Sequence, residues 1–207
     1  MHLGPGPIYL YKVITDMAIR EILQIGHPIL AARAEELEPG RIETAEVQSW
    51  IDDMIDTMRD ADGAGIAANQ IGIPYRLFVI EVGNNPRYPY KPPVPLTVVI
   101  NPSVEFLSDE TFESSEGCLS VPQIRADVDR HVEIAVSYVD REGEKISHDV
   151  RGYSACTWQH EYDHLEGVLF VHRVTNLQSF CSWSAFEEFR QEQFAAMVAQ
   201  LVEKWGA

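Results

Sequence analysis

The chain lacks the features typical of membrane, disulfide-rich and nucleic-acid-binding proteins. No apolar run approaches the ~18 residues that a membrane span needs, and the longest, such as 96–100, have the length of a strand. Cysteines are few, 3 in 207 residues, and their odd number suits a reducing, cytoplasmic setting. Basic residues are outnumbered, 16 against 32 acidic ones, and the net charge of −16 repels nucleic acid and anionic membranes. We expect no nucleic-acid specificity and no membrane contact.

The domain organisation predicted from the sequence is simple. With 45% apolar and 23% charged residues, a chain of this length can bury a core of its own. Residues 1–16 lack the pattern of a signal or transit peptide, and we interpret them as a leader or an added extension. Residues 17–207 then form a single domain. The proline-rich segment 84–95 is predicted to be an extended loop, because proline suits neither helix nor strand interiors.

Hydrophobic periodicity predicts helices at both ends of the domain and strands between them. Apolar residues at three and four spacing predict helices over 44–61, about 153–165 and about 184–204. β-Branched residues predict strands over 77–82, 96–100 and 132–139, the last forming a hairpin with the segment up to Val150. This order of elements predicts an α+β fold rather than a doubly wound sheet.

The clearest chemical signal is the segment His160-Glu161-Tyr162-Asp163-His164. Two histidines four residues apart lie on one helix face, so both imidazoles can reach one divalent ion. Glu161, next to the first histidine, can act as general base toward water. The pattern is typical of a hydrolytic metal site, although a solvated helix face with merely polar histidines is the alternative.

A catalytic site of this kind needs a third protein ligand, and several downstream or neighbouring residues are poor candidates. One metalloprotease class has its third histidine where Phe170 stands, and phenylalanine cannot bind a metal. Glu187 and Glu188 lie on the acidic face of the last predicted helix, which favours solvated charges. Cys156 is about 12 Å along the helix from His164, whereas a Zn–S bond is ~2.3 Å, so a buried core cysteine is its better interpretation.

Two other segments are weak signals when taken singly. Cys118 follows Gly117 in a turn-like stretch where glycine allows close backbone approach to a ligand, but a single cysteine is usually structural. The small residues of 63–72 include Gln70, a neutral amide donor, and could equally form a tight turn that caps a helix. Neither segment by itself identifies the third ligand.

Taken together, the three segments resemble peptide deformylase. The family's motif GxGxAAxQ stands at 63–70, EGCLS at 116–120 and QHExDH at 159–164. The resemblance runs from about Met17 to about Arg173 and does not cover 1–16. It implies antiparallel sheets packed around a central HExxH helix, with a C-terminal helix. It also implies a bacterial, cytoplasmic hydrolase of protein biosynthesis that removes the N-formyl group from formylmethionine of nascent polypeptides and releases formate.

The resemblance assigns roles to specific residues. The metal ligands fall on Cys118, His160 and His164, and Glu161 would move the proton. The side-chain amide of Gln70 and the backbone N–H of Leu119 would stabilise the oxygen of the formyl group. One divalent ion per chain is expected, Fe²⁺ in the cell, with Zn²⁺, Ni²⁺ or Co²⁺ as substitutes. Cys/His/His ligation alone would have suggested zinc first.

The resemblance also implies a substrate-binding surface and a pocket for an unbranched methionine side chain. Its residues are Ala64, Gly65, Gly117, Arg125, Tyr153, Cys156 and Thr157, with His160 at the edge. Arg130 is placed to pair with Glu116 and hold the cysteine loop. An ordinary surface ion pair is the alternative interpretation for Arg125 and Arg130.

The sequence departs from the family pattern in two places. Where a subgroup often has Gly-Leu-Arg-Gly, residues 123–126 contain no glycine, which puts the outer substrate preferences in doubt. A transient ribosome contact is known for family members with a basic C-terminal helix, whereas 182–205 holds four glutamates against Arg190 and Lys204. We therefore expect weak ribosome affinity, or docking through another face.

Two other functions are compatible with parts of the pattern. A general zinc endopeptidase would need a ligand other than Cys118 and would cleave internal bonds of unformylated proteins. A catalytically silent metal-binding or ribosome-associated module would need no general base, yet Glu161 is present.

Overall fold

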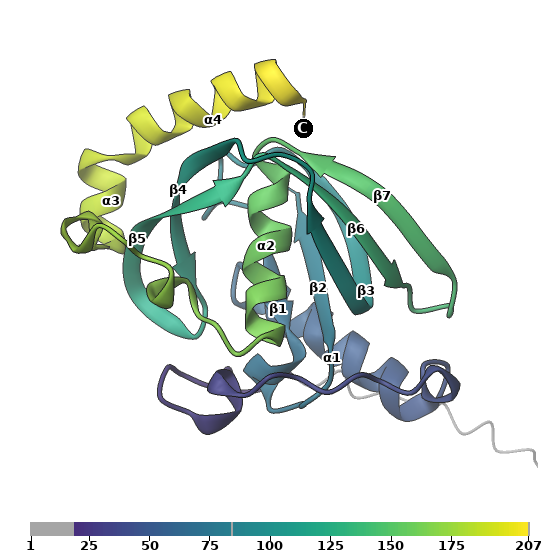
Figure 1. Cartoon of the computed structure of the whole chain (residues 1–207). Coiled ribbons are helices and arrows are strands. Elements are labelled where there is room, and N and C mark those ends of the chain that lie inside the picture. The colour runs from purple at the N-terminus through teal and green to yellow at the C-terminus, as the bar shows by residue number, and fades with distance from the viewer. Residues whose placement is uncertain (1–18, 84, 207) are drawn as a thin grey trace, which may run out of the picture.

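The computed structural model describes residues 19–83 and 85–206. The predicted leader, 1–16, lies outside these residues. Two antiparallel sheets flank one helix, and two further helices follow at the C-terminus (Figure 1). The larger sheet has the order β1 (Gly65–Ala67), β2 (Leu77–Val82), β3 (Val94–Phe106), β6 (Glu133–Val139), β7 (Lys145–Arg151). The smaller has the order β4 (Thr111–Cys118), β5 (Val121–His131), β8 (Cys181–Ser182). The structure thus confirms the predicted α+β class.

Helix α1 (Ala45–Asp60) supports the larger sheet from one side. Thr44 caps it by accepting a hydrogen bond from the backbone N–H of Val47 at 3.4 Å. Its apolar stripe, which includes Ile51 and Met54, is fully buried against Leu77 and Val79 of β2. The observed helix lies within the predicted 44–61, because capping and periodicity agree there.

Helix α2 (Ser154–Leu165) lies between the two sheets and is buried on nearly every side (Figure 1). One side packs Trp158 edge-on against Phe78 of β2, with ring centroids 5.6 Å apart. The opposite side packs Tyr153 and Cys156 among the aromatic residues of the C-terminal helices. The buried polar residues of this helix therefore cannot be solvated, which contradicts the alternative of an exposed histidine face.

The C-terminal segment forms two helices rather than the single helix predicted over 184–204. Helix α3 (Trp183–Phe189) and helix α4 (Gln191–Trp205) meet at Arg190, whose backbone (φ −125°, ψ −25°) leaves the helical conformation. Phe186 and Phe194 turn inward and pack with their ring centroids 5.6 Å apart. The aromatic side chains reach the core on both sides of the break.

Strands β4 and β5 were not predicted, and the turn-like assignment of 116–120 is correct only for Leu119 and Ser120. Residues up to Cys118 belong to β4, and only Leu119 and Ser120 separate it from β5. The inward side chains of this hairpin include Ser114, Glu116 and Arg130, which are buried polar groups. Strands with polar inner faces lack the apolar alternation that identifies a strand in a sequence.

Short 3₁₀ helices lie in the segments that precede or connect these elements. They span Pro28–Ala31, Pro39–Arg41, Ala68–Ile71, Phe170–His172 and Leu177–Ser179. No helix in the part of the chain that the structure describes is both long and apolar enough to cross a membrane.

Candidate metal centre and cavity

The end of β4 and one face of α2 bring a sulfur and two imidazoles together. One ligand atom from each of Cys118, His160 and His164 lies within 4.8 Å of the others. The Sγ of Cys118 is 3.3 Å from Nε2 of His164. Because His160 and His164 are one helical turn apart, their rings are adjacent, with centroids separated by 5.1 Å. Three donor atoms at these separations can bind one ion.

The ring of His160 is oriented by a carboxylate on β4. Its Nδ1 lies 2.7 Å from Oε2 of Glu116, which leaves Nε2 to face the cluster. Burial alone would lower the pKa of His160, but its hydrogen bonds to Cys118 and Glu116 raise it well above the usual value. The pKa of His164 is lowered, first by burial and then by His160. A carboxylate behind a metal-binding histidine fixes its tautomer and direction.

Glu116 is in turn held by a buried arginine. Nε and Nη2 of Arg130 donate to its two oxygens at 2.6 and 2.9 Å, and the two side chains are 3% and 4% exposed. Nη1 of Arg130 donates to Asp163 at 2.7 Å, and Arg173 also binds Asp163. The pairing of Arg130 with Glu116 was predicted, but the alternative of a surface ion pair is wrong. This network joins the β4–β5 hairpin to α2.

Glu161 lies inside the cavity beside this cluster. Burial raises its pKa to about 7, and Oε2 has no hydrogen-bond partner among the described residues. A Cβ on Gly65 would lie 2.7 and 2.9 Å from Cδ and Cγ of Glu161. Only glycine therefore allows β1 to pass this close to the carboxylate. A buried carboxylate with a pKa near neutrality is suited to proton transfer.

Two N–H donors are grouped around the sulfur of Cys118. Oε1 of Gln70 accepts from the backbone N–H of Ala67 at 2.8 Å, which turns Nε2 toward Ser120 (3.0 Å) and the sulfur (3.6 Å). The backbone N–H of Ser120 also donates to this sulfur at 3.4 Å. Leu119 lies in the two-residue turn directly after Cys118. The residues predicted to bind the formyl oxygen are thus beside the sulfur.

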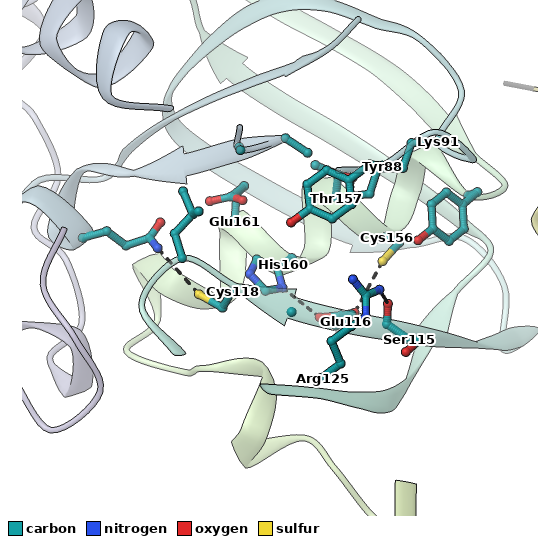
Figure 2. A pocket seen from close by; sticks show the side chains of 17 residues that line it. Tyr88, Lys91, Ser115, Glu116, Cys118, Arg125, Cys156, Thr157, His160 and Glu161 are labelled. Carbon is teal, nitrogen blue, oxygen red and sulfur yellow. Dashed lines mark hydrogen bonds and ion pairs between the residues drawn. The ribbon is translucent and has the colours of Figure 1, made fainter. Parts of the chain in front are cut away.

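These residues line one small cavity of about 40 Å³ (Figure 2). Every predicted site residue lines it except His164, which lies behind it in the cluster. The predicted residues on its wall are Ala64, Gly65, Gln70, Gly117, Cys118, Leu119, Arg125, Tyr153, Cys156, Thr157, His160 and Glu161. Glu187 and Glu188, the weaker candidates for ligands, are exposed on α3.

Arg125 and Cys156 are more enclosed than the sequence suggested. Arg125 is 1% exposed, and its guanidinium carbon lies 3.9 Å from the centroid of Phe186, so the alternative of a surface ion pair is wrong here too. Its Nη2 donates to the carbonyl of Ser115 and to the hydroxyl of Tyr90. Burial raises the pKa of Cys156 to about 12, which keeps it a thiol that donates to Glu116 at 3.4 Å.

Three residues of the cavity wall were not predicted from the sequence. Tyr88 and Lys91 come from the proline-rich segment, and Ser115 comes from β4. Nζ of Lys91 donates to Oγ1 of Thr157 at 3.0 Å, and both are beside Tyr88 in Figure 2. An aromatic and a basic residue among prolines were the only signal that this loop could reach the site. A proline-rich loop is rigid enough to hold them there.

The donor set fits a metal ion. One thiol sulfur and two imidazole nitrogens are the ligands that zinc and other late transition metals take, and solvent can complete a fourth position. The buried Oε2 of Glu161 and Nδ1 of His164 both lack a hydrogen-bond partner among the described residues. Unpaired polar atoms are rare in protein interiors and are frequent at functional sites. The arrangement can support metal-assisted hydrolysis of a small carbonyl group.

Comparisons with known proteins agree with this chemistry. The family model described as polypeptide deformylase matches residues 19–180. Peptide deformylase 2 of a Nostoc species is 45% identical over 153 residues, which cover 74% of this chain and 84% of the relative. The Met-Ala-Ser-bound class I type b peptide deformylase of Acinetobacter baumannii is 34% identical with a TM-score of 0.74, covering 76% of this chain and 99% of that one. A peptide deformylase of Thermotoga maritima is 36% identical with a TM-score of 0.68, covering 77% and 99%.

Proposed function

The chain belongs to the polypeptide deformylase family, a family of hydrolases, and from this premise we propose that it is metal-dependent, hydrolyses the N-formyl group of newly made polypeptides and releases formate. The first residue of its substrates is formylmethionine. The observation that carries the proposal is the cluster of Cys118, His160 and His164 beside the buried carboxylate of Glu161.

The three clustered residues would hold one divalent ion. Bound there, the ion supplies Lewis acidity toward a carbonyl oxygen and makes water more acidic. Ferrous iron is the ion that the family resemblance implies, with zinc, nickel or cobalt as substitutes. The N–H groups of Ser120 and Gln70 are directed at the sulfur and would stabilise the negative charge that it carries as a metal ligand.

Glu161 would carry the proton. Its carboxylate faces the cavity and has one oxygen without a partner among the described residues. It can take a proton from the attacking water and deliver it to the nitrogen of the departing amine. The pKa near 7 that burial produces suits both halves of this transfer.

Gln70 and Leu119 would stabilise the charge that grows on the formyl oxygen. Oε1 of Gln70 accepts from the backbone N–H of Ala67, which holds the amide nitrogen at the cavity wall beside Cys118. Loss of one such donor typically costs about 10² to 10³ in rate. The peptide would run beside Ala64 and Gly117, pairing with backbone groups as an added strand. The Met-Ala-Ser bound by the Acinetobacter relative is the kind of peptide that deformylation yields, which supports a peptide substrate.

The partners that follow are formylated nascent peptides in the bacterial cytoplasm. Helix α4 has Glu192 in its first turn and Lys204 as its basic residue in the last turn, so it offers no basic surface to ribosomal RNA. We therefore keep the expectation of a weak, transient ribosome contact.

Replacement of the proton carrier tests the mechanism. We expect Glu161→Gln to lower formate release from formyl-Met-Ala-Ser by at least about 10²-fold while the bound metal stays stoichiometric. Glu105→Gln, on an exposed carboxylate of β3, is the matched control and should be unchanged. Near-normal turnover by Glu161→Gln would overturn the mechanism. Cleavage of unformylated casein by the wild-type enzyme would favour the endopeptidase alternative instead.

A further inference from the structure

The cavity wall mixes polar and aromatic side chains where a methionine pocket should be mainly apolar. Among the described residues that line it, only Ala64 and Leu119 have aliphatic side chains. Pockets that bind apolar groups are lined mainly by hydrophobic side chains with few polar ones. The part of the cavity assigned to the substrate side chain is bordered by Tyr153, Cys156 and Thr157, whose hydroxyl and thiol groups replace aliphatic side chains there, although the thiol itself is bonded to Glu116.

Lys91 brings an ammonium group into this part of the cavity. Its Nζ is 3.0 Å from Oγ1 of Thr157 and lies 4.9 and 5.8 Å from the ring centroids of Tyr88 and Tyr153. Thr157 precedes Glu161 by one helical turn, so the amine is close to the reacting centre along α2. Figure 2 shows Lys91 and Thr157 on the far side of the pocket from Cys118.

The charges nearby leave this amine available to a ligand. Lys91 and Arg125 donate hydrogen bonds to hydroxyls and a backbone carbonyl, and neither pairs with a carboxylate within residues 19–83 and 85–206. Glu116, the nearest buried acid on β4, is already saturated by Arg130 and His160. An ammonium has three donors, and one hydrogen bond to Thr157 leaves donors for a second acceptor.

We propose that Lys91 is a specificity-determining residue, and that the cavity favours a first residue whose side chain carries an acceptor oxygen, namely the sulfoxide of formylmethionine. The proposal rests on the deformylase function proposed above. The sulfoxide keeps the length of methionine and replaces a weak sulfur acceptor with a polar oxygen. The protein itself performs no redox step, because oxidation of the methionine precedes binding. An apolar pocket would reject the same oxygen, since it would lose its water and gain no partner.

The test compares three peptides that differ only at the first side chain. Formyl-Met-Ala-Ser, its sulfoxide and formyl-norleucine-Ala-Ser are assayed for kcat/KM with the wild-type enzyme, Lys91→Met and Lys91→Arg. Lys145→Met, on the exposed part of β7, is the control. We expect the sulfoxide-to-methionine ratio of kcat/KM to exceed one in the wild-type enzyme, to fall about tenfold in Lys91→Met, to be retained in Lys91→Arg and to be unchanged in the control. A fall of less than threefold in Lys91→Met would overturn the proposal.

A binding measurement separates this proposal from the proposed function. Calorimetry of Met-Ala-Ser and its sulfoxide with the same variants reports the side-chain preference without turnover, and the ratio of their Kd values should change in the same direction. Absence of formate from every peptide would overturn the deformylase mechanism, whereas formate release with an unchanged ratio would overturn only the role of Lys91. If Lys91→Met does not fold, Thr157→Val, which removes the hydroxyl that holds the amine, must lower the ratio at least threefold.

Discussion

The buried pairing of Arg130 with Glu116 allows a test in which burial is the main variable. The chain contains a second bidentate pair, Arg59 with Glu81, at 2.7 and 2.9 Å, almost the same distances as the buried pair. Arg59 and Glu81 are 52% and 28% exposed, whereas Arg130 and Glu116 are 3% and 4% exposed. Two substitutions, Arg130→Met and Arg59→Met, therefore remove the same kind of bond from two different environments.

The magnitudes follow from what each substitution leaves behind. Arg130→Met leaves the carboxylate of Glu116 in the interior with only His160 and the Cys156 thiol as partners, and breaking a buried pair in this way costs about 3–5 kcal/mol. Asp163 keeps Arg173, so the second acid is not orphaned. Arg59→Met frees a partly solvated carboxylate, and exposed pairs contribute only about 0.2–1 kcal/mol.

The pH dependence of the free energy of unfolding provides an independent test of the role of Arg130. Burial alone would raise the pKa of Glu116, but Arg130 and then His160 hold it well below the usual value. A carboxylate with a lowered folded-state pKa adds stability that is present above its unfolded pKa, about 4.3, and is lost as the pH falls through the folded value. Without Arg130, burial dominates and the charged form is disfavoured. The difference in stability between wild type and Arg130→Met should therefore be larger at pH 7 than at pH 4.5.

Urea unfolding of the metal-free protein, followed by tryptophan fluorescence at both pH values, measures these differences. An Arg130→Met variant that is destabilised no more than Arg59→Met at pH 7 would contradict the role of burial. A difference in stability between wild type and Arg130→Met that is independent of pH would contradict the lowered pKa of Glu116.

Two further substitutions test backbone positions. Gly65→Ala places a methyl group against Glu161 and should lower kcat/KM about 10²-fold by displacing the carboxylate. Gly40→Ala is the control, because its Cβ would meet nothing within 4 Å. Equal kcat/KM values for the two variants would contradict the steric effect. Gln123 has a φ of 63°, a left-handed conformation that costs a residue with a Cβ about 1–2 kcal/mol. Glycine avoids this strain but loses more backbone entropy on folding, so Gln123→Gly should raise the free energy of unfolding by about 0.5–1 kcal/mol. Gln123→Ala keeps the strain, and a gain there equal to that of glycine would show that strain is not the cause.

Elements with a regular apolar pattern could be predicted from the sequence. Strand β2 was predicted with its observed limits, Leu77–Val82, because its side chains are buried almost throughout and many are β-branched. Helix α1 was predicted to within a residue at each end, because Thr44 is a favourable cap and the stripe from Val47 to Met58 keeps its period. In these segments, local preference and burial favour the same structure.

The β4–β5 hairpin could not be predicted because functional polar residues occupy inward positions where apolar residues are expected. Glu116 and Arg130 face inward, where apolar residues would ordinarily identify a strand. Their charges are tolerated because they neutralise one another and orient His160. The contribution of Lys91 to the cavity wall could not be predicted either, because nothing in the neighbouring sequence indicates that this residue of a proline-rich loop reaches Thr157. Long-range pairing of polar groups leaves no periodic trace in a sequence.

The bonds of Arg130 to Glu116 and Asp163 affect both the stability of the fold and the positions of the three metal-ligand atoms. Helix α2 supplies His160 and His164, while β4 supplies Cys118, so the three donor atoms meet only when the hairpin is seated against the helix. Arg130 fixes that seating by binding Glu116 on β4 and Asp163 on α2 at once. Loss of these Arg130 bonds would let the sulfur of Cys118 move relative to the two imidazoles even in a protein that still folds. Arg130→Met should therefore weaken metal binding more than Arg59→Met does, beyond what their difference in global stability predicts, because the site is assembled from two elements rather than one.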